Sequence, residues 1–271
     1  MLKVRVIPTL LWKQFGLVKG IGFDSWRRVG SVLPAVKVYN QREVDELILV
    51  DVVAHQSADE LDFESIDEFG QDCFVPLTVG GGITRIEQVQ KLLRAGADKV
   101  CVNTAAYTCP ELISEIAKRH GSQCVIASID VRQDPLGAGW KCFSHAGKQP
   151  TGREVCAWAR EVEDRGAGEI LITSIERDGT FQGYDLALIA AVVHAVKIPV
   201  IASGGAGNYQ HIVDAVKQAG ASAVAAASMF HFTEQTPAGA KAAMQDAGIP
   251  VRRNFIDNVK KLISPSAPTL P

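Results

Sequence analysis

The residues of this 271-residue chain that could carry out chemistry follow short apolar stretches. Polar side chains stand at the ends of five such stretches: Asp51, Asn103, Asp130, Thr173 with Ser174, and Ser203. A carboxylate at a strand end can move protons or orient a base, so Asp130 is a candidate acid; anchoring the segment after it is the alternative. Thr173, Ser203 and Lys19 complete the candidate catalytic set. Lys19 could close over an anionic ligand, or it could be a solvated surface residue.

Two glycine-rich stretches predict where an anionic ligand would bind. Residues 77–83 read LTVGGGI, and residues 201–207 read IASGGAG. Glycine after a buried strand permits a sharp turn and a close approach of the ligand, and the amide groups that open the next helix suit phosphate. Two such stretches indicate a ligand with a phosphate at each end; glycines that serve only tight turns are the alternative.

The two stretches belong to an internal repeat. Gly204 lies 124 positions after Gly80, and Gly220 lies 124 positions after Gly96. The second pair sits in the matching sequences AGADKV and AGASAV. Two features at one offset indicate two halves with the same layout.

Alternating strands and helices are expected along the chain. Eight apolar runs predict strands: residues 4–10, 46–53, 76–80, 99–103, 124–130, 169–174, 199–204 and 223–228. Residues 86–95, 111–120 and 155–165 have helical periodicity. The pattern predicts an α/β fold, a (β/α)8 TIM barrel built of two similar half-barrels. A doubly wound open sheet is the rival, and the repeat favours closure.

The remaining segments break this regularity. Residues 12–23 predict a long first loop, and residues 131–150 a second long segment with a short hairpin strand at 140–143; such loops usually cover an active site. Residues 1–252 are expected to form the barrel. Residues 253–271 are expected to be a partly disordered tail, with a short amphipathic helix at 254–263.

Composition excludes several classes of function. The net charge of −2 leaves no basic footprint for nucleic acid, and no apolar run is long enough to span a membrane. The six cysteines form no CxxC pair, which predicts free thiols in a cytoplasmic protein. The histidines lack metal-ligand spacing, so no metal or cofactor is expected. No signal-peptide pattern opens the sequence.

A charged set lies at the opposite ends of the predicted strands. It comprises Arg5, Glu46, Lys99 and Glu169, each at the start of a run. Two positive and two negative side chains there could form a ring of salt bridges across the barrel bottom. Stability is the default role of that face, and a gate for a small polar molecule is the alternative.

Seven segments together carry a resemblance to a known family. They are VGGGI (79–83), AGADKV (95–100), GSQ (121–123), GAGEIL (166–171), RDGT (177–180), GYD (183–185) and ASGGAG (202–207). Over about residues 1–252 the chain resembles the cyclase subunit of imidazole glycerol phosphate synthase. The resemblance implies a barrel of histidine biosynthesis that receives ammonia from a glutaminase docked at its bottom. Ammonia would cross the core to a bisphosphorylated ribulosyl substrate, giving imidazole glycerol phosphate and aminoimidazole carboxamide ribotide.

The resemblance also implies roles for particular residues. One phosphate would lie near Gly82, Asn103 and Thr104. The other would lie near Asp178, Gly179, Gly204, Gly205, Ala227 and Ser228. Arg5, Glu46, Lys99 and Glu169 match the family's ammonia gate, and Asp98 matches a position that faces the glutaminase. Asp130 matches a catalytic acid, and Lys19 matches a loop lysine.

One departure from the family pattern concerns the first strand. The family places its second catalytic aspartate where this chain has Leu11, which can neither transfer a proton nor accept a hydrogen bond. Together with GLVK (16–19), RVGS (28–31) and VDELI (44–48), Leu11 resembles a paralogous branch. That branch is thought to supply ammonia to a sugar amidotransferase of surface-polysaccharide synthesis.

Three functions therefore stay open. The favoured one is an ammonia-conducting paralogue with a glutaminase partner. The second is an active cyclase of histidine biosynthesis, and the third is a non-catalytic barrel that binds a phosphorylated metabolite or scaffolds a partner.

Overall fold

Eight parallel strands form a closed barrel in this computed structural model, which describes residues 2–13, 16–53, 61–137 and 139–252. Their bounds are β1 (Arg5–Lys13), β4 (Leu47–Asp51), β5 (Leu77–Gly80), β6 (Lys99–Val102), β7 (Val125–Gln133), β10 (Glu169–Ser174), β11 (Val200–Ser203) and β12 (Ala223–Ala226). They are adjacent in this order, and β12 pairs with β1 to close the ring. The predicted TIM barrel is confirmed.

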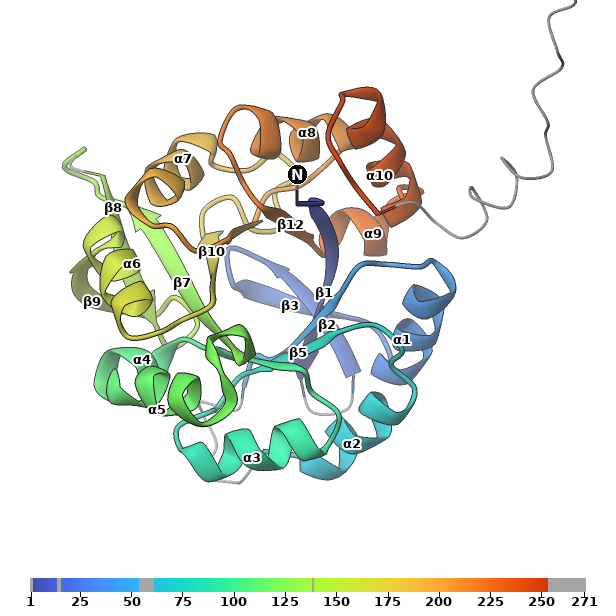
Figure 1. Ribbon diagram of the computed structural model, residues 1–271. Coiled ribbons are helices and arrows are strands. Elements are labelled where there is room, and N and C mark those ends of the chain that lie inside the picture. Colours follow the sequence, from blue (N-terminus) through green and yellow to red (C-terminus); the bar gives the residue numbers. More distant parts are fainter. Residues whose placement is uncertain (1, 14–15, 54–60, 138, 253–271) are drawn as a thin grey trace, which may run out of the picture.

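Helices surround the strands, as Figure 1 shows. The longer ones are α1 (Val32–Gln41), α2 (Phe63–Gln71), α3 (Ile86–Arg94), α5 (Glu111–His120), α6 (Val155–Asp164), α7 (Leu186–Ala195), α8 (Tyr209–Lys217) and α10 (Pro237–Asp246). Helix α3 buries Ile86, Val89 and Leu92 on one face, as its periodicity predicts. No helix among the described residues is long and apolar enough to cross a membrane.

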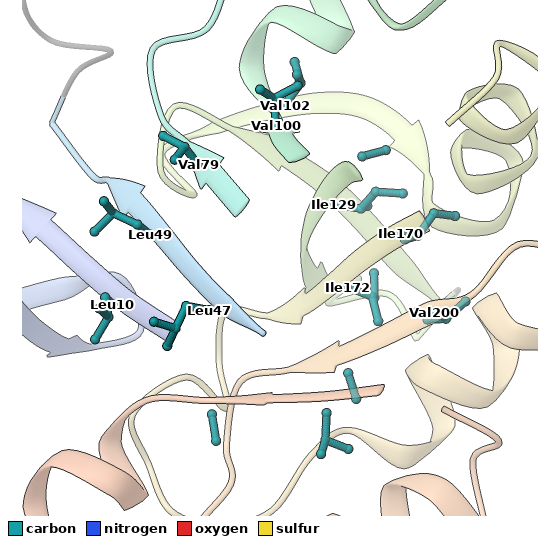
Figure 2. Packing of buried hydrophobic residues seen from close by; sticks show 14 of the residues in the cluster. Leu10, Leu47, Leu49, Val79, Val100, Val102, Ile129, Ile170, Ile172 and Val200 are labelled. Carbon is teal, nitrogen blue, oxygen red and sulfur yellow. The ribbon is translucent and has the colours of Figure 1, made fainter. Parts of the chain in front are cut away.

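Alternation along each strand produces two apolar layers. In β4, Leu47 and Leu49 point outward to the helices, while Ile48 points into the barrel. Figure 2 shows residues of the outer layer, in which Leu49 lies beside Val79 of the neighbouring strand β5. The inner layer consists of Ile7, Ile48, Cys101, Ile126, Leu171, Ile201, Ala223 and Ala225. The barrel axis is therefore apolar over this layer.

The internal repeat appears as matched local geometry. Strand β6 is followed by the short helix α4 (Thr104–Thr108), and β12 by the short helix α9 (Ser228–Phe232), so the helices begin 124 positions apart. The residues before them have nearly the same backbone angles, φ −119° and ψ −85° for Asn103 and φ −121° and ψ −70° for Ala227. The two halves thus present equivalent turns at the same end of the barrel.

The prediction of a loop over residues 12–23 is wrong. Strand β1 continues to Lys13, and β2 (Gly16–Ile21) pairs antiparallel with both β1 and β3 (Asp24–Gly30). Gly22 and Phe23, both with positive φ, form only the turn of the hairpin between β2 and β3. The predicted second hairpin is confirmed: β8 (Trp140–Ser144) and β9 (Gln149–Glu154) extend the sheet from β7.

The predicted tail, including the helix at 254–263, lies outside the described residues. The last described residues join the chain to the barrel bottom, where Val251 bridges to Val4.

Candidate functional site

A cavity of about 470 Å³ opens at the carboxyl ends of the barrel strands. Every residue predicted to be catalytic or phosphate-binding lines it: Lys19, Gly82, Asn103, Thr104, Asp130, Thr173, Asp178, Gly179, Ser203, Gly204, Gly205, Ala227 and Ser228. Asp51 lines the cavity as well, whereas Ser174 is not among the lining residues. The fold therefore gathers these residues into one site, and their chemical roles stay predictions.

The glycines of the two repeated stretches form the cavity wall. Gly81 and Gly205 have φ values of +100° and +105°, which favour glycine. A Cβ atom on Gly81 would lie 2.1 Å from the carbonyl oxygen of Asp51, and one on Gly205 would lie 2.2 Å from that of Gly183. These positions require glycine for conformation and for space, and the resulting backbone is exposed to the cavity.

Lys19 forms a buried ion pair across the cavity rim. Its Nζ lies 2.7 Å from each carboxylate oxygen of Asp178, and the side chains are only 2% and 12% exposed. The backbone N–H of Gly22 also donates to the carbonyl of Asp178, at 2.9 Å. The β2–β3 hairpin is thus fastened over the cavity. The carboxylate of Asp178 is therefore taken up by Lys19.

Asp130 is a buried carboxyl group in the cavity wall. The pKa of Asp130 is raised to about 7, first by burial and then by the negative charge of Asp178, while a hydrogen bond with Thr173 partly offsets both effects. Asn103 Nδ2 donates to Asp130 Oδ2 at 3.0 Å and so orients the group. A carboxyl with a pKa near neutrality can both donate and accept a proton, which suits acid–base chemistry.

Leu11 and Thr9 bring the first strand into the same cavity. They lie on the same face of β1, on either side of Leu10, and both line the space. Thr9 Oγ1 is buried and has no hydrogen-bond partner among the described residues. Leu11 gives this wall of the cavity an apolar side chain, next to Val50 of the neighbouring strand β4. Strand β1 itself therefore offers a ligand one hydroxyl and no charge.

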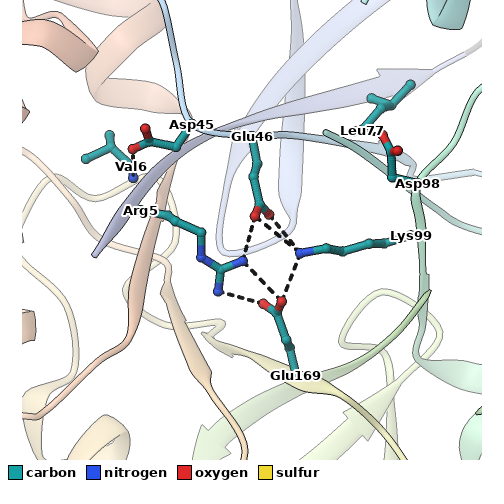
Figure 3. A network of polar contacts seen from close by, with 8 residues as sticks. All are labelled: Arg5, Val6, Asp45, Glu46, Leu77, Asp98, Lys99 and Glu169. Carbon is teal, nitrogen blue, oxygen red and sulfur yellow. Dashed lines mark hydrogen bonds and ion pairs between the residues drawn. The ribbon is translucent and has the colours of Figure 1, made fainter. Parts of the chain in front are cut away.

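The four charged residues at the strand starts form a closed ring of ion pairs (Figure 3). Arg5 lies 2.7 Å from Glu46 and 2.8 Å from Glu169, and Lys99 lies 3.1 Å and 2.8 Å from the same carboxylates. Burial alone would lower the pKa of Arg5, but the hydrogen bonds and charges of the two glutamates outweigh burial and raise it. Burial would likewise raise the pKa of Glu169, yet Arg5 and Lys99 hold it lowered. Arg5 and Glu169 are therefore held charged, and the four side chains together lie across the mouth of the barrel axis.

Asp98 lies beside this ring. It is exposed, and its Oδ2 accepts a hydrogen bond of 2.8 Å from the backbone N–H of Leu77 (Figure 3). Because it immediately precedes Lys99, Asp98 belongs to the same end of the barrel as the ring.

No cluster of three or more His, Cys, Asp or Glu side chains suited to a metal occurs in the described part of the chain. The six cysteines are free thiols, as predicted.

Comparisons with known proteins agree with this architecture. A family model described as "Histidine biosynthesis protein" matches residues 5–236. "Imidazole glycerol phosphate synthase subunit HisF" from two strains of Caulobacter vibrioides is 46% identical over 252 residues, which cover 93% of this chain and 97% of the relative. The protein of the same name from Gluconacetobacter diazotrophicus is 46% identical over 253 residues, with the same coverage. The chain belongs to the family of imidazole glycerol phosphate synthase cyclase subunits.

Sequence reasoning missed several cavity residues of this cyclase-family barrel. Phe23 and Trp26 reach the cavity from the β2–β3 hairpin, and His145 reaches it from the β8–β9 turn. The backbone N–H of His145 donates to Thr104 Oγ1 at 3.0 Å, which ties that turn to the phosphate-binding candidates. Both long segments thus cover the site, as predicted. No local pattern marks these three residues, because their position depends on how two hairpins fold back over the barrel.

Proposed function

We propose that this cyclase-subunit-like barrel takes ammonia from a glutaminase partner and conducts it for amidation of a surface-polysaccharide sugar. The observation that carries the proposal is Leu11, at the position of a catalytic carboxylate, in a barrel that keeps the charged ring. Loss of one member of a catalytic pair commonly costs several orders of magnitude in rate. Cyclisation is therefore the step that this chain has given up.

The interior of the barrel supports ammonia transfer. Between the ring and the cavity, the inner layer is made of apolar side chains such as Ile48, Ile126 and Leu171. An ammonium ion would lose its hydration there at a cost of many kcal/mol, whereas neutral ammonia would lose only a few hydrogen bonds. The ring fits the role of a gate. Lys99, whose flexible side chain is 14% exposed, is the member that can move aside with least disturbance to the strands.

The cavity supports continued binding of a phosphorylated ligand. Gly82, Asn103 and Thr104 would hold one phosphate, and the turns at Gly205 and Ser228 would hold the other. The equivalent geometry of α4 and α9 supports this two-ended arrangement. Asp130 would serve as the acid, and Lys19 would act from the β2–β3 hairpin, with Thr173 and Ser203 lining the same cavity. The acceptor of the ammonia would be a third protein, a sugar amidotransferase that makes an acetamidino group.

The second candidate is an active cyclase of histidine biosynthesis. It is favoured by the identity of 46% with proteins named as imidazole glycerol phosphate synthase subunits and by the pKa of about 7 for Asp130. In that case Asp51, which also lines the cavity, would compensate for Leu11. A barrel that binds a phosphorylated metabolite without catalysis is the remaining alternative.

The deciding experiment is turnover of the bisphosphorylated ribulosyl substrate with saturating ammonium salt, for the wild type and for Leu11→Asp. We expect no wild-type turnover and measurable activity in Leu11→Asp, because the cavity keeps every other predicted site residue. Leu11→Asn, which matches the size of aspartate but cannot ionise, is the control and should stay inactive. Clear wild-type turnover would assign the chain to histidine biosynthesis instead.

A further inference from the structure

Two large apolar side chains project into solvent at the end of the barrel that carries the charged ring. Leu2, which is 90% exposed, lies three residues before Arg5, and Phe74, which is 82% exposed, lies just before β5. Among the described residues, only Leu136 is comparably exposed, at 91%, and it follows the carboxyl end of β7. Exposed aromatic side chains of this size commonly mark interaction sites.

The backbone of Phe74 is fixed by helix α1. Its N–H donates to Asn40 Oδ1 at 3.1 Å, and Asn40 Nδ2 donates to the carbonyl of Asp72. Lys37 of the same helix lies 3.2 Å from the carboxylate of Asp72. The connection from α2 to β5 is therefore clamped on both sides of Cys73, and Phe74 is held out into solvent. A side chain presented on a rigid backbone loses little entropy when a partner covers it.

Phe74 also lies close in sequence to residues that contact the neighbours of the ring residues Glu46 and Lys99. The backbone N–H of Leu47, which follows Glu46, donates to the carbonyl of Pro76 at 2.9 Å. Pro76 is only two residues beyond Phe74, and the exposed Asp98 is bonded to Leu77 next to it. Phe74 therefore stands at the edge of the entrance to the barrel axis.

We propose that Phe74 is the main apolar anchor for the glutaminase subunit that delivers ammonia, with Leu2, which precedes β1 two strands away around the barrel, as a second contact. This inference rests on the proposed function. A donor of ammonia must seal its outlet against the ring, because ammonia released into water becomes ammonium at neutral pH. The partner should therefore carry an apolar pocket for Phe74 beside groups that face Asp98.

The test measures affinity between the full 271-residue chain and each glutaminase subunit of the imidazole glycerol phosphate synthase type from the same genome. Titration calorimetry gives the dissociation constant, and glutamate release gives the stimulation of the glutaminase. We expect Phe74→Ala to weaken binding by at least about 10-fold. At saturating concentrations of the barrel protein, Phe74→Ala should stimulate glutamate release as much as the wild type does, since the charged ring is unchanged.

Leu136→Ala removes a side chain of equal exposure away from the ring and is the matched control, expected to bind within twofold of the wild type. Circular dichroism should show that both variants fold. Wild-type binding that Phe74→Ala leaves within twofold would overturn the anchor but not the proposed function. If the wild type binds and stimulates none of the glutaminases, the proposed function falls, and the anchor falls with it. A wild-type dimer that Phe74→Ala dissolves, without glutaminase binding, would assign the surface to a second copy of this chain.

Discussion

The buried pair of Lys19 and Asp178 allows a sharp stability prediction. Lys19→Met keeps the apolar stem of the side chain and removes the ammonium group. Because the two side chains are only 2% and 12% exposed, the carboxylate of Asp178 would remain buried without its partner. Removing one member of a buried pair costs about 3–5 kcal/mol. The open cavity beside Asp178 favours the lower end of that range.

A loss of about 3 kcal/mol in the free energy of unfolding lowers the melting temperature by roughly 6–12 °C in a chain of this size. Lys19→Met/Asp178→Leu removes both charges and should recover most of the loss, since no charge is then buried alone. Asp178→Leu alone should be about as unstable as Lys19→Met, because it leaves the ammonium group of Lys19 buried without its partner.

The assay is urea unfolding of the wild type, both single variants and the double variant at pH 7. Hydrogen exchange of residues 16–30 would report whether the β2–β3 hairpin opens. The reasoning is refuted if Lys19→Met changes the free energy of unfolding by less than about 1 kcal/mol and leaves the exchange of the hairpin unchanged.

Two further predictions concern the cavity wall. In the folded chain the pKa of Asp130 is about 7, above the ordinary value of 3.8, so the stability from its neutral form is complete below pH 4 and is lost as the pH rises through 7. Relative to the wild type, Asp130→Asn should therefore gain roughly 2–3 kcal/mol in free energy of unfolding between pH 5 and pH 8. A carboxyl NMR titration that places Asp130 below pH 5 would contradict this. Gly81→Ala should lose more than about 2 kcal/mol, because its Cβ meets backbone, whereas Gly137→Ala, also at positive φ but in open space, should lose about 1 kcal/mol or less. Equal melting temperatures for the two variants would show that space at Gly81 is not limiting.

The barrel could be predicted from the sequence because its signals are local and repeated. A buried parallel strand such as 47–51 needs apolar residues on both faces, and the helix that follows needs an apolar stripe. The alternation of strands and helices can therefore be recognised from residues that are near one another in the sequence. The offset of 124 between Gly96 and Gly220 then indicated two similar halves. Since the carboxyl ends of parallel strands meet at one edge, the positions of Asn103 and Asp130 in the site followed from strand ends alone.

Other features depend on contacts between residues that are distant in the sequence. Lys19 was expected in a loop, but the hairpin places it against Asp178, 159 positions away. His145 enters the cavity because the β8–β9 turn folds back onto Thr104. The pKa of Asp130 depends on burial and on Asp178, and neither is visible in the residues next to it. The positions of four charged residues at the starts of predicted strands indicated a charged ring. Arg5 and Lys99 pair with the same two glutamates only because the barrel closes. Closure brings side chains up to 164 positions apart to within about 3 Å, a distance that no sequence pattern specifies.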